Sequence, residues 1–189
     1  MNRNQNILIT GATSGIGEAL ALHYAKTTGK TLFLCGRDES RLKAVTQKCT
    51  HAGAVVFSNI VDVTDKDAIK NWIQSCEEKA NINLVIANAG VATLQENTEN
   101  IYKTFDTNVY GVLNTVLPAL EIYKNRLRKQ TSGTSSLDQF INKMKKQKKA
   151  FSINPFTKKY LSNIGCELYN TDQKAIAIVS SIAGYHGLP

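Results

Sequence analysis

Short apolar runs of four to six residues alternate along the chain with longer stretches in which apolar residues recur every three or four positions. The short runs predict buried strands, and the longer stretches predict amphipathic helices. Their alternation is typical of an α/β protein whose parallel sheet is doubly wound by helices. The predicted strands span 6–10, 31–35, 54–58, 84–87 and 175–180, and the predicted helices span 15–28, 38–49, 64–79 and 99–124.

Two of these helices carry more specific predictions. In the helix over 64–79, Thr64 is a candidate N-cap, and Asp67 makes the first turn acidic. In the long helix over 99–124, apolar side chains at helical spacing predict a face that points to the core. These side chains belong to Ile101, Phe105, Val109, Val112 and Val116.

Length and composition favour one soluble domain. The chain has 189 residues, of which 42% are hydrophobic and 20% are charged. The first strand begins near Asn6, which leaves no room for a signal peptide, and no apolar run approaches the roughly 20 residues of a membrane helix. We therefore expect a cytoplasmic protein without a membrane partner. The cysteines lack CxxC or metal-ligand spacing, so they predict reduced thiols and no metal site: Cys35, Cys49, Cys76 and Cys166.

The net charge of +8 is concentrated in one segment, residues 125–172, which holds ten of the 23 basic residues and only three of the 15 acidic ones. Connections between a helix and a strand usually take about 2–6 residues. We therefore interpret 125–172 as a basic loop inserted into a single domain that spans 1–189. The lysine cluster at 143–149 leaves nucleic-acid or membrane-surface binding as an alternative function, although charge runs on inserted loops are usually only solvated.

The first predicted strand is followed directly by a glycine-rich turn with Gly11, Gly15 and Gly17. A dinucleotide site requires glycines at such a junction, for the tight turn, for close approach to a pyrophosphate and for close packing of helix on strand. The N-terminus of the following helix then favours phosphate charge. The alternative is an ordinary glycine-rich turn between a strand and a helix.

Five motifs stand in one order along the chain. They are Thr10-Gly11-Ala12-Thr13-Ser14-Gly15-Ile16-Gly17, Asp62-Val63, Asn88-Ala89-Gly90, Asn108 within Asn-Val-Tyr-Gly, and Ser180-Ser181-Ile182-Ala183-Gly184. In this order they resemble the short-chain dehydrogenase/reductase family. The resemblance implies an NAD(P)-binding domain with a Rossmann-like doubly wound parallel sheet, here incomplete at its C-terminal edge. It also implies an oxidoreductase that transfers hydride between NADP(H) and a small carbonyl or alcohol substrate.

The resemblance also assigns residues to the cofactor. It places around the dinucleotide Gly11, Thr13, Ser14, Gly15, Ile16, Gly17, Asp62, Val63, Asn88, Ala89 and Gly90. Asp62 and Val63 would touch the adenine ring, although Asp62 could equally be a turn residue ahead of Thr64. The role implied for Asn88, Ala89 and Gly90 is mostly structural support near the cofactor ribose.

The resemblance implies that the residue at the end of the second strand contacts the adenosine ribose. An acidic residue there accepts from the 2′-hydroxyl group, whereas an arginine accommodates a 2′-phosphate. Here Gly36 leaves space and Arg37 offers a planar fork for phosphate, so we predict a preference for NADP(H), with NAD(H) possible. Asp38 next to it could instead approach the ribose, and Arg37 could be an ordinary exposed charge at the start of a helix.

For catalysis, the resemblance implies that Ser181 hydrogen-bonds the substrate carbonyl, with Ser180 as the alternative in a shifted register. Asn108 would kink the long helix and hold a water in a proton relay; otherwise it is a solvent-facing or back-bonded asparagine.

The family's proton donor is a tyrosine followed four residues later by a lysine, and none of the seven tyrosines here has that partner. We therefore expect a truncated chain that is inactive alone. The alternatives are a non-catalytic NADP(H)-binding remnant and one half of a split enzyme, completed by a C-terminal polypeptide. The dimer and tetramer surfaces of the family use the long helix and elements after the serine, so the resemblance implies a homo-oligomer as one partner but does not set the oligomeric state.

Overall fold

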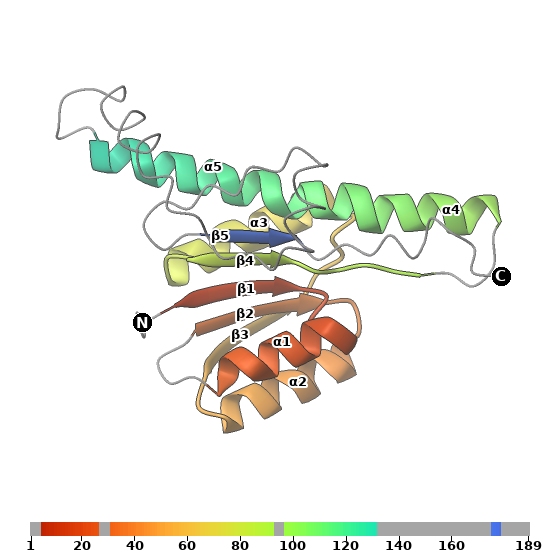
Figure 1. The fold of residues 1–189 in the computed structure, drawn as a ribbon, viewed down its shortest axis with the longest axis horizontal. Helices are drawn as coiled ribbons and strands as arrows, with labels where there is room; N and C mark the ends of the chain where they lie inside the picture. Colours follow the sequence, from red (N-terminus) through yellow and green to blue (C-terminus); the bar gives the residue numbers. More distant parts are fainter. Residues whose placement is uncertain (1–4, 27–30, 93–96, 132–174, 179–189) are drawn as a thin grey trace, which may run out of the picture. The chain divides into compact units, whose positions relative to one another are not determined.

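The sheet of this protein is built from parallel strands. The computed structural model describes residues 5–26, 31–92, 97–131 and 175–178. Its strands lie in the order β3-β2-β1-β4-β5, and the neighbouring pairs β1–β2, β2–β3 and β1–β4 are parallel (Figure 1). The strands are β1 (Asn6–Thr10), β2 (Thr31–Gly36), β3 (Val55–Ile60), β4 (Leu84–Ala87) and β5 (Ala175–Ile178). The predicted α/β fold with a parallel sheet is thereby confirmed.

The apolar runs of β1 and β2 are buried because helices cover both faces of the sheet. Ile7 and Ile9 pack into a core cluster with residues of α1 (Gly15–Ala25) and α2 (Glu39–His51). Side chains alternate along a strand, so the intervening Leu8 points to the opposite face and is also fully buried. Strand β3 lies at one edge, and most of its residues are exposed.

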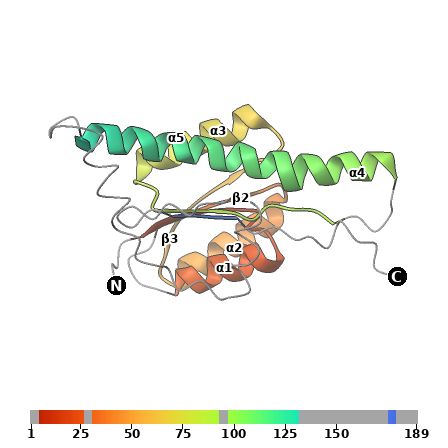
Figure 2. The ribbon, with the colours of Figure 1, turned by 45° about the horizontal axis from the view of Figure 1, so that its top comes forward.

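Helices α1 and α2 cover one face of the sheet, and α3 (Lys66–Lys79) covers the other together with the first half of α5 (Gly111–Thr131), whereas α4 (Thr98–Phe105) extends past the ends of the strands (Figure 2). The elements from β1 to the first half of α5 belong to one compact unit. Helix α1 ends at Ala25, three residues before the predicted end. Within the described ranges, no helix has both the length and the apolar character needed to cross a bilayer.

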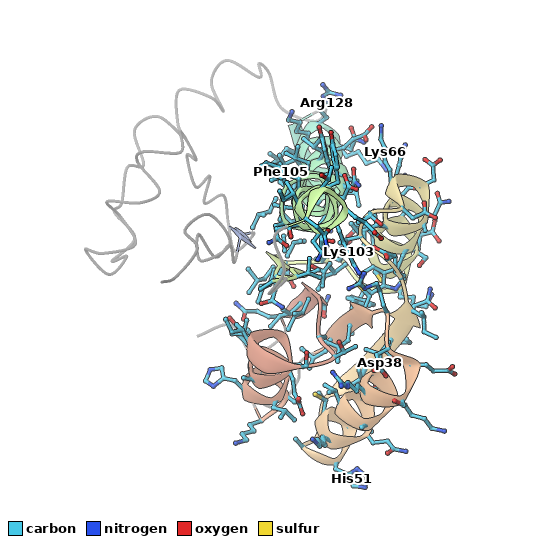
Figure 3. All side chains as sticks on the ribbon, turned by 90° about the vertical axis from the view of Figure 1, so that its right-hand side faces the viewer. Asp38, His51, Lys66, Lys103, Phe105 and Arg128 are labelled. Atoms are coloured by element: carbon cyan, nitrogen blue, oxygen red, sulfur yellow. The ribbon has the colours of Figure 1, made fainter. Side chains whose placement is uncertain are left out.

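Two helices begin at aspartate caps. The Asp38 carboxylate accepts from the N–H of Arg41 at the start of α2, and Figure 3 labels Asp38 and His51 at the two ends of this helix. The Asp65 carboxylate accepts from the N–H groups of Asp67 and Ala68 at the start of α3. The prediction that Thr64 caps α3 is therefore wrong. A carboxylate one residue later reaches the same orphan donors.

The long predicted helix over 99–124 consists of three segments. A π-helical turn, η1 (Asp106–Tyr110), separates α4 from α5, and helical structure continues to Thr131. Such turns insert one extra residue and are frequent at functional sites. The sequence pattern gave no warning of it, because periodicity alone does not distinguish an α-helical turn from a π-helical one.

The predicted core face of this helix is wrong at three positions. Ile101, Phe105 and Val109 are 51%, 41% and 43% exposed. Small residues face the protein instead, and they are Thr107, Gly111, Thr115 and Ala119. The helix backbone comes so close that a Cβ on Gly111 would lie 2.5 Å from a Val63 methyl carbon. Only small side chains fit at that separation.

Candidate dinucleotide-binding site

A cleft of about 700 Å³ opens at the carboxyl ends of the parallel strands. The strand order reverses between β1 and β4, and ligands of open α/β sheets bind outside the strands at such a reversal. The cleft volume suits a small-molecule ligand. Of the residues predicted to bind the cofactor, only Gly17 does not line this cleft. The lining residues are Gly11, Thr13, Ser14, Gly15, Ile16, Arg37, Asp62, Val63, Asn88, Ala89 and Gly90.

The glycines allow three backbone segments to approach closely: the loop after β1, the start of α1 and the segment after β4. Gly11 has a φ of 67°, and a Cβ at this position would lie 2.6 Å from the Ala89 Cα. A Cβ on Gly17 would collide with the Gly11 carbonyl oxygen and lie 2.6 Å from Asn88 Nδ2. Gly17 thus lies behind the cleft surface, where it sets the distance between α1 and β1. The absence of a side chain at Gly11 and Gly15 leaves backbone facing the cleft at these two positions.

The N-terminus of α1 is left open toward the cleft. Its N-cap Ser14 makes no side-chain capping bond, whereas α2, α3 and α4 are each capped by an aspartate or asparagine side chain. Gly15 and Ile16, the first residues of the helix, line the cleft. Uncapped N–H groups and the helix dipole together attract an anion such as a phosphate.

Asn88 ties the end of β4 to the glycine loop. Its Nδ2 donates to the carbonyl oxygens of Thr10 and Gly11 at 3.1 and 3.2 Å. The N–H groups of Asn88 and Ala89 donate to the Thr10 hydroxyl oxygen at 3.1 and 3.2 Å. These bonds give Asn88 the supporting role that the resemblance implied. Its contact with a cofactor remains a prediction.

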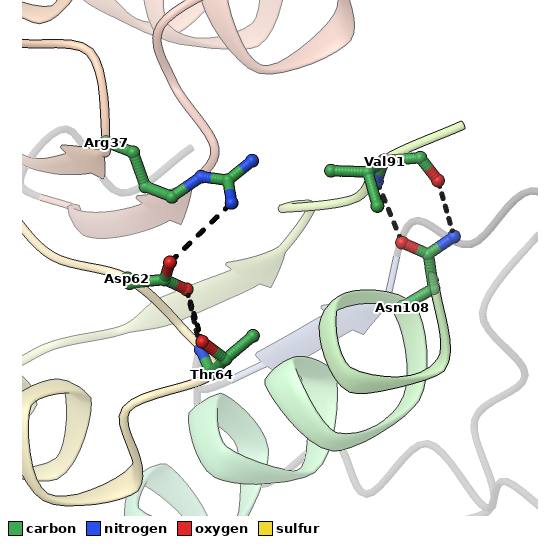
Figure 4. A network of polar contacts seen from close by, with 5 residues as sticks. All are labelled: Arg37, Asp62, Thr64, Val91 and Asn108. Carbon is green, nitrogen blue, oxygen red and sulfur yellow. Dashed lines mark hydrogen bonds and ion pairs between the residues drawn. The ribbon is translucent and has the colours of Figure 1, made fainter. Parts of the chain in front are cut away.

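Arg37 and Asp62 form an ion pair across the cleft, with 3.6 Å between Nη1 and Oδ2 (Figure 4). The other Asp62 oxygen accepts from the N–H and the hydroxyl group of Thr64, at 2.9 and 2.8 Å. Asp62 is therefore a turn residue ahead of Thr64, the alternative that the sequence left open, and it also lines the cleft. Partial burial raises its pKa, but the two Thr64 hydrogen bonds and the Arg37 charge outweigh burial and hold that pKa below its ordinary value.

The Asp38 carboxylate is hydrogen-bonded to residues of α2, the helix that it caps. Its Oδ1 accepts from the Arg41 N–H and the Ser40 hydroxyl at 2.9 and 2.8 Å, and its Oδ2 lies 3.3 Å from Arg41 Nε. The Arg41 N–H bond and the Ser40 bond lower the pKa of Asp38. Arg41 lines the cleft beside Arg37, and sequence reasoning missed it. Its position four residues after Arg37, in the first turn of the helix that follows, was the signal that could have found it.

Asn108 holds the loop after β4 against the π-helical turn. Its Oδ1 accepts from the Val91 N–H at 2.8 Å, and its Nδ2 donates to the Val91 carbonyl at 2.9 Å (Figure 4). Its side chain is thus neither solvent-facing nor back-bonded. The π-helical turn lies where the resemblance implied a kink. Ser180 and Ser181, most of the basic segment and Cys166 lie outside the described residues, so the roles predicted for them stay predictions.

The described cysteines play no visible part in the cleft. Cys35, Cys49 and Cys76 are buried free thiols, and burial raises the pKa of each. No group of three potential metal ligands was found among the described residues. Thr107, directly before Asn108, does line the cleft and was also missed by sequence reasoning.

An open helix N-terminus, a glycine-rich loop and two arginines around one cleft fit a dinucleotide with a pyrophosphate. The fold and the cleft define a dinucleotide-binding α/β protein. Residues 5–134 match the family model described as "short chain dehydrogenase", which covers more than half of the chain. The protein belongs to the short-chain dehydrogenase/reductase family.

Relatives with known sequences support this membership. An uncharacterized oxidoreductase of Myxococcus xanthus is 36% identical over 138 residues, which cover 70% of this chain and 54% of that protein. Sulfoacetaldehyde reductase 2 of Chromohalobacter salexigens is 32% identical over 123 residues, covering 60% of this chain and 48% of that protein. The chain thus spans about half the length of these relatives.

Solved structures agree in fold. An alcohol dehydrogenase from Thermococcus sibiricus, complexed with 5-hydroxy-NADP, superposes with a TM-score of 0.60 and 28% identity over 64% of this chain and 54% of that one. A short-chain dehydrogenase/reductase from Burkholderia phymatum in complex with NAD gives 0.59 and 28% over 65% of this chain and 46% of that one. Proteins similar to this chain therefore include one bound to an NADP derivative and one bound to NAD.

Proposed function

We propose that this protein is an oxidoreductase that binds NADP(H) and serves hydride transfer to or from a small carbonyl or alcohol substrate. One observation carries the proposal: the uncapped N-terminus of α1 opens, behind a glycine-rich loop, into a cleft lined by Arg37 and Arg41. When bound, the dinucleotide would supply the hydride. The residues of this chain would bind and orient the dinucleotide and surround it with polar groups.

The preference for NADP(H) over NAD(H) follows from the charges at the mouth of the cleft. Asp38, the carboxylate that could have accepted from a ribose 2′-hydroxyl, is committed to capping α2 and pairing with Arg41. Arg37 is held only by a half-exposed ion pair of 3.6 Å. Such pairs contribute about 0–1 kcal/mol. Arg37 can therefore turn to a 2′-phosphate at small cost.

For the chemical step we propose Ser181 and Asn108 as catalytic residues. Ser181 would donate to the substrate oxygen, where negative charge develops as hydride arrives at carbon. Asn108 would act from the π-helical turn, since its side chain is already fixed by both polar groups of Val91. The proton would come from a Tyr-x-x-x-Lys pair, which the printed sequence does not contain.

We expect the 189-residue polypeptide to bind NADPH but to reduce no aldehyde or ketone, because it lacks the tyrosine that donates the proton. Fluorescence titration with NADPH and NADH measures binding, and NADPH absorbance in the presence of a carbonyl panel measures turnover. Absence of NADPH binding contradicts the proposal itself. Turnover that Ser181→Ala abolishes contradicts only the expected inactivity.

Two arrangements are consistent with binding without turnover. In a split enzyme, a second polypeptide carrying a Tyr-x-x-x-Lys pair would restore turnover when mixed with this chain. A non-catalytic NADP(H)-binding remnant would remain inactive with any such polypeptide. We keep a cytoplasmic location as a prediction, and nothing in the described cleft favours nucleic acid as a ligand.

We also propose that the chain forms a homo-oligomer through the outer face of α4 and α5. Large apolar side chains recur there every fourth residue and are 41–59% exposed: Ile101, Phe105, Val109, Leu113 and Leu117. A repeat of four drifts around an α-helix with 3.6 residues per turn, and the wider π-helical turn takes up part of that drift. The five side chains thereby form one continuous row, which a second copy can cover.

The double variant Leu113→Glu/Leu117→Glu is expected to shift the protein to a monomer in sedimentation velocity while its NADPH affinity stays the same. Two carboxylates in an apolar contact cannot be desolvated without a partner. Lys43→Glu on α2 changes the net charge by the same amount away from this face and is expected to leave the oligomer intact. A wild-type protein that sediments as a monomer contradicts the proposal.

A further inference from the structure

We propose that the hydroxyl group of Thr107 hydrogen-bonds the adenosine half of the bound dinucleotide. This inference rests on the proposed function and adds to the site a residue that neither the glycine loop nor the arginines involve. Thr107 is 4% exposed, yet it is among the residues that line the cleft. It is thus a buried side chain that meets the space where the ligand is expected.

The Thr107 hydroxyl has no hydrogen-bond partner among the residues that the structure describes. Two other threonines, in α4 and α5, show the usual hydrogen bond of a threonine hydroxyl to its own helix. Thr104 donates to the Asn100 carbonyl and Thr115 to the Gly111 carbonyl, each four residues back and each at 2.8 Å. A buried hydroxyl without a partner is destabilising, and such groups are rare in native proteins. The Thr46 hydroxyl on α2 also lacks a partner among the described residues, but Thr46 does not line the cleft, whereas Thr107 does.

The π-helical turn explains why Thr107 differs. Thr107 lies inside η1, where the backbone bond runs from the Gly111 N–H to the carbonyl of Asp106, five residues back. The carbonyl four residues before Thr107 belongs to Lys103, and it accepts the backbone N–H of Asp106. Within this widened turn the hydroxyl of Thr107 makes no bond to its own helix, and rotation about χ1 can turn it toward the cleft that the residue lines.

The neighbours of Thr107 locate the contact on the ligand. One residue further, Asn108 is bonded to Val91 in the loop after β4. One turn further, Gly111 packs against Val63, the residue proposed to touch adenine. Thr107 thus lies between the Val63 side of the cleft and the loop after β4. A hydroxyl both donates and accepts, so either a ribose hydroxyl or a ring nitrogen of adenosine can pair with it.

Thr107→Val keeps the shape of the side chain and removes the hydroxyl. We expect its affinity for NADPH to fall roughly three- to tenfold, the range of one neutral hydrogen bond. Its melting temperature without ligand should stay the same or rise, because the variant removes an unpaired buried group. Thr107→Ser should keep most of the affinity. The isolated fragment 2′,5′-ADP should lose affinity by the same factor as NADPH.

Thr115→Val is the matched control, since Thr115 is equally buried on the same helix but bonds its own backbone and does not line the cleft. It should lower the melting temperature and leave NADPH affinity unchanged. The inference is overturned if Thr107→Val binds NADPH like the wild type, or if it loses stability instead, as the loss of a buried water would cause. A wild-type protein that binds no dinucleotide would refute the proposed function first.

Discussion

Gly17→Ala is expected to lower the free energy of unfolding by about 3 kcal/mol and the affinity for NADPH by roughly 100-fold or more. Two effects oppose each other at this position. Alanine is favoured over glycine inside a helix by about 1 kcal/mol. The added Cβ, however, would overlap the Gly11 carbonyl oxygen and come within 2.6 Å of Asn88 Nδ2.

The steric effect dominates because the nearest obstacle is backbone, which cannot rotate away. The clash is relieved only if α1 moves off β1, and that movement displaces the helix N-terminus from the position of the pyrophosphate. Loss of binding should therefore exceed what the loss of stability alone would cause. Urea denaturation gives the stability, and NADPH titration of the folded fraction gives the affinity.

Gly53→Ala provides the control. Gly53 has a φ of 97°, and nothing lies within 4 Å of the position of its Cβ. The backbone strain should lower stability by about 1–2 kcal/mol. Gly53 lies outside the cleft, so NADPH affinity should not change. A Gly17→Ala protein as stable as the wild type would show that α1 and β1 are not held as closely as described.

Local sequence signals were sufficient for the sheet and for the glycine loop. The apolar runs of β1 and β2 are buried on both faces, so a continuous run was an unambiguous signal of a strand. The predicted cofactor residues other than Gly17 come together because each follows or ends a parallel strand, and such strands all end at one edge. Gly17 has a backbone role that its spacing from Gly11 already indicated.

The same reasoning failed for the long helix, and for a physical reason. Periodicity identifies an apolar face but does not say what covers it. In this helix the large apolar residues such as Ile101 and Phe105 lie outside, while Thr107, Gly111 and Thr115 face the protein. Close packing of backbone on the loop after β3 selects small residues, and that selection depends on a tertiary distance.

The polar contacts of the site were also beyond the sequence. Whether Asp38 would approach a ribose or cap a helix depended on where α2 begins relative to Arg37. The pairing of Arg37 with Asp62 joins the ends of β2 and β3, and the orphan hydroxyl of Thr107 follows from a π-helical turn that has no sequence signature here. These features arise from the geometry between elements.

Arg37→Ala is expected to weaken NADPH binding by roughly 10- to 150-fold while NADH binding stays within a factor of about three. The range corresponds to the loss of charged hydrogen bonds worth about 1.5–3 kcal/mol between a guanidinium group and a 2′-phosphate. Arg37→Lys keeps the charge but loses the planar fork, so its NADPH affinity should be intermediate. Titrations of each variant with both cofactors measure the ratio.

The ion pair between Arg37 and Asp62 should not make this specificity depend on pH near neutrality. The pKa of Asp62 lies below the ordinary value, so Asp62 is ionised throughout the neutral range and Arg37 always has a competing partner. The ratio of NADPH to NADH affinity should therefore depend on pH near neutrality only through the phosphate itself. Lys43→Ala removes one positive charge from α2 without lining the cleft and should preserve the ratio. An unchanged ratio in Arg37→Ala would instead make Arg37 an ordinary surface charge, because its ion pair with Asp62 would then be its only role.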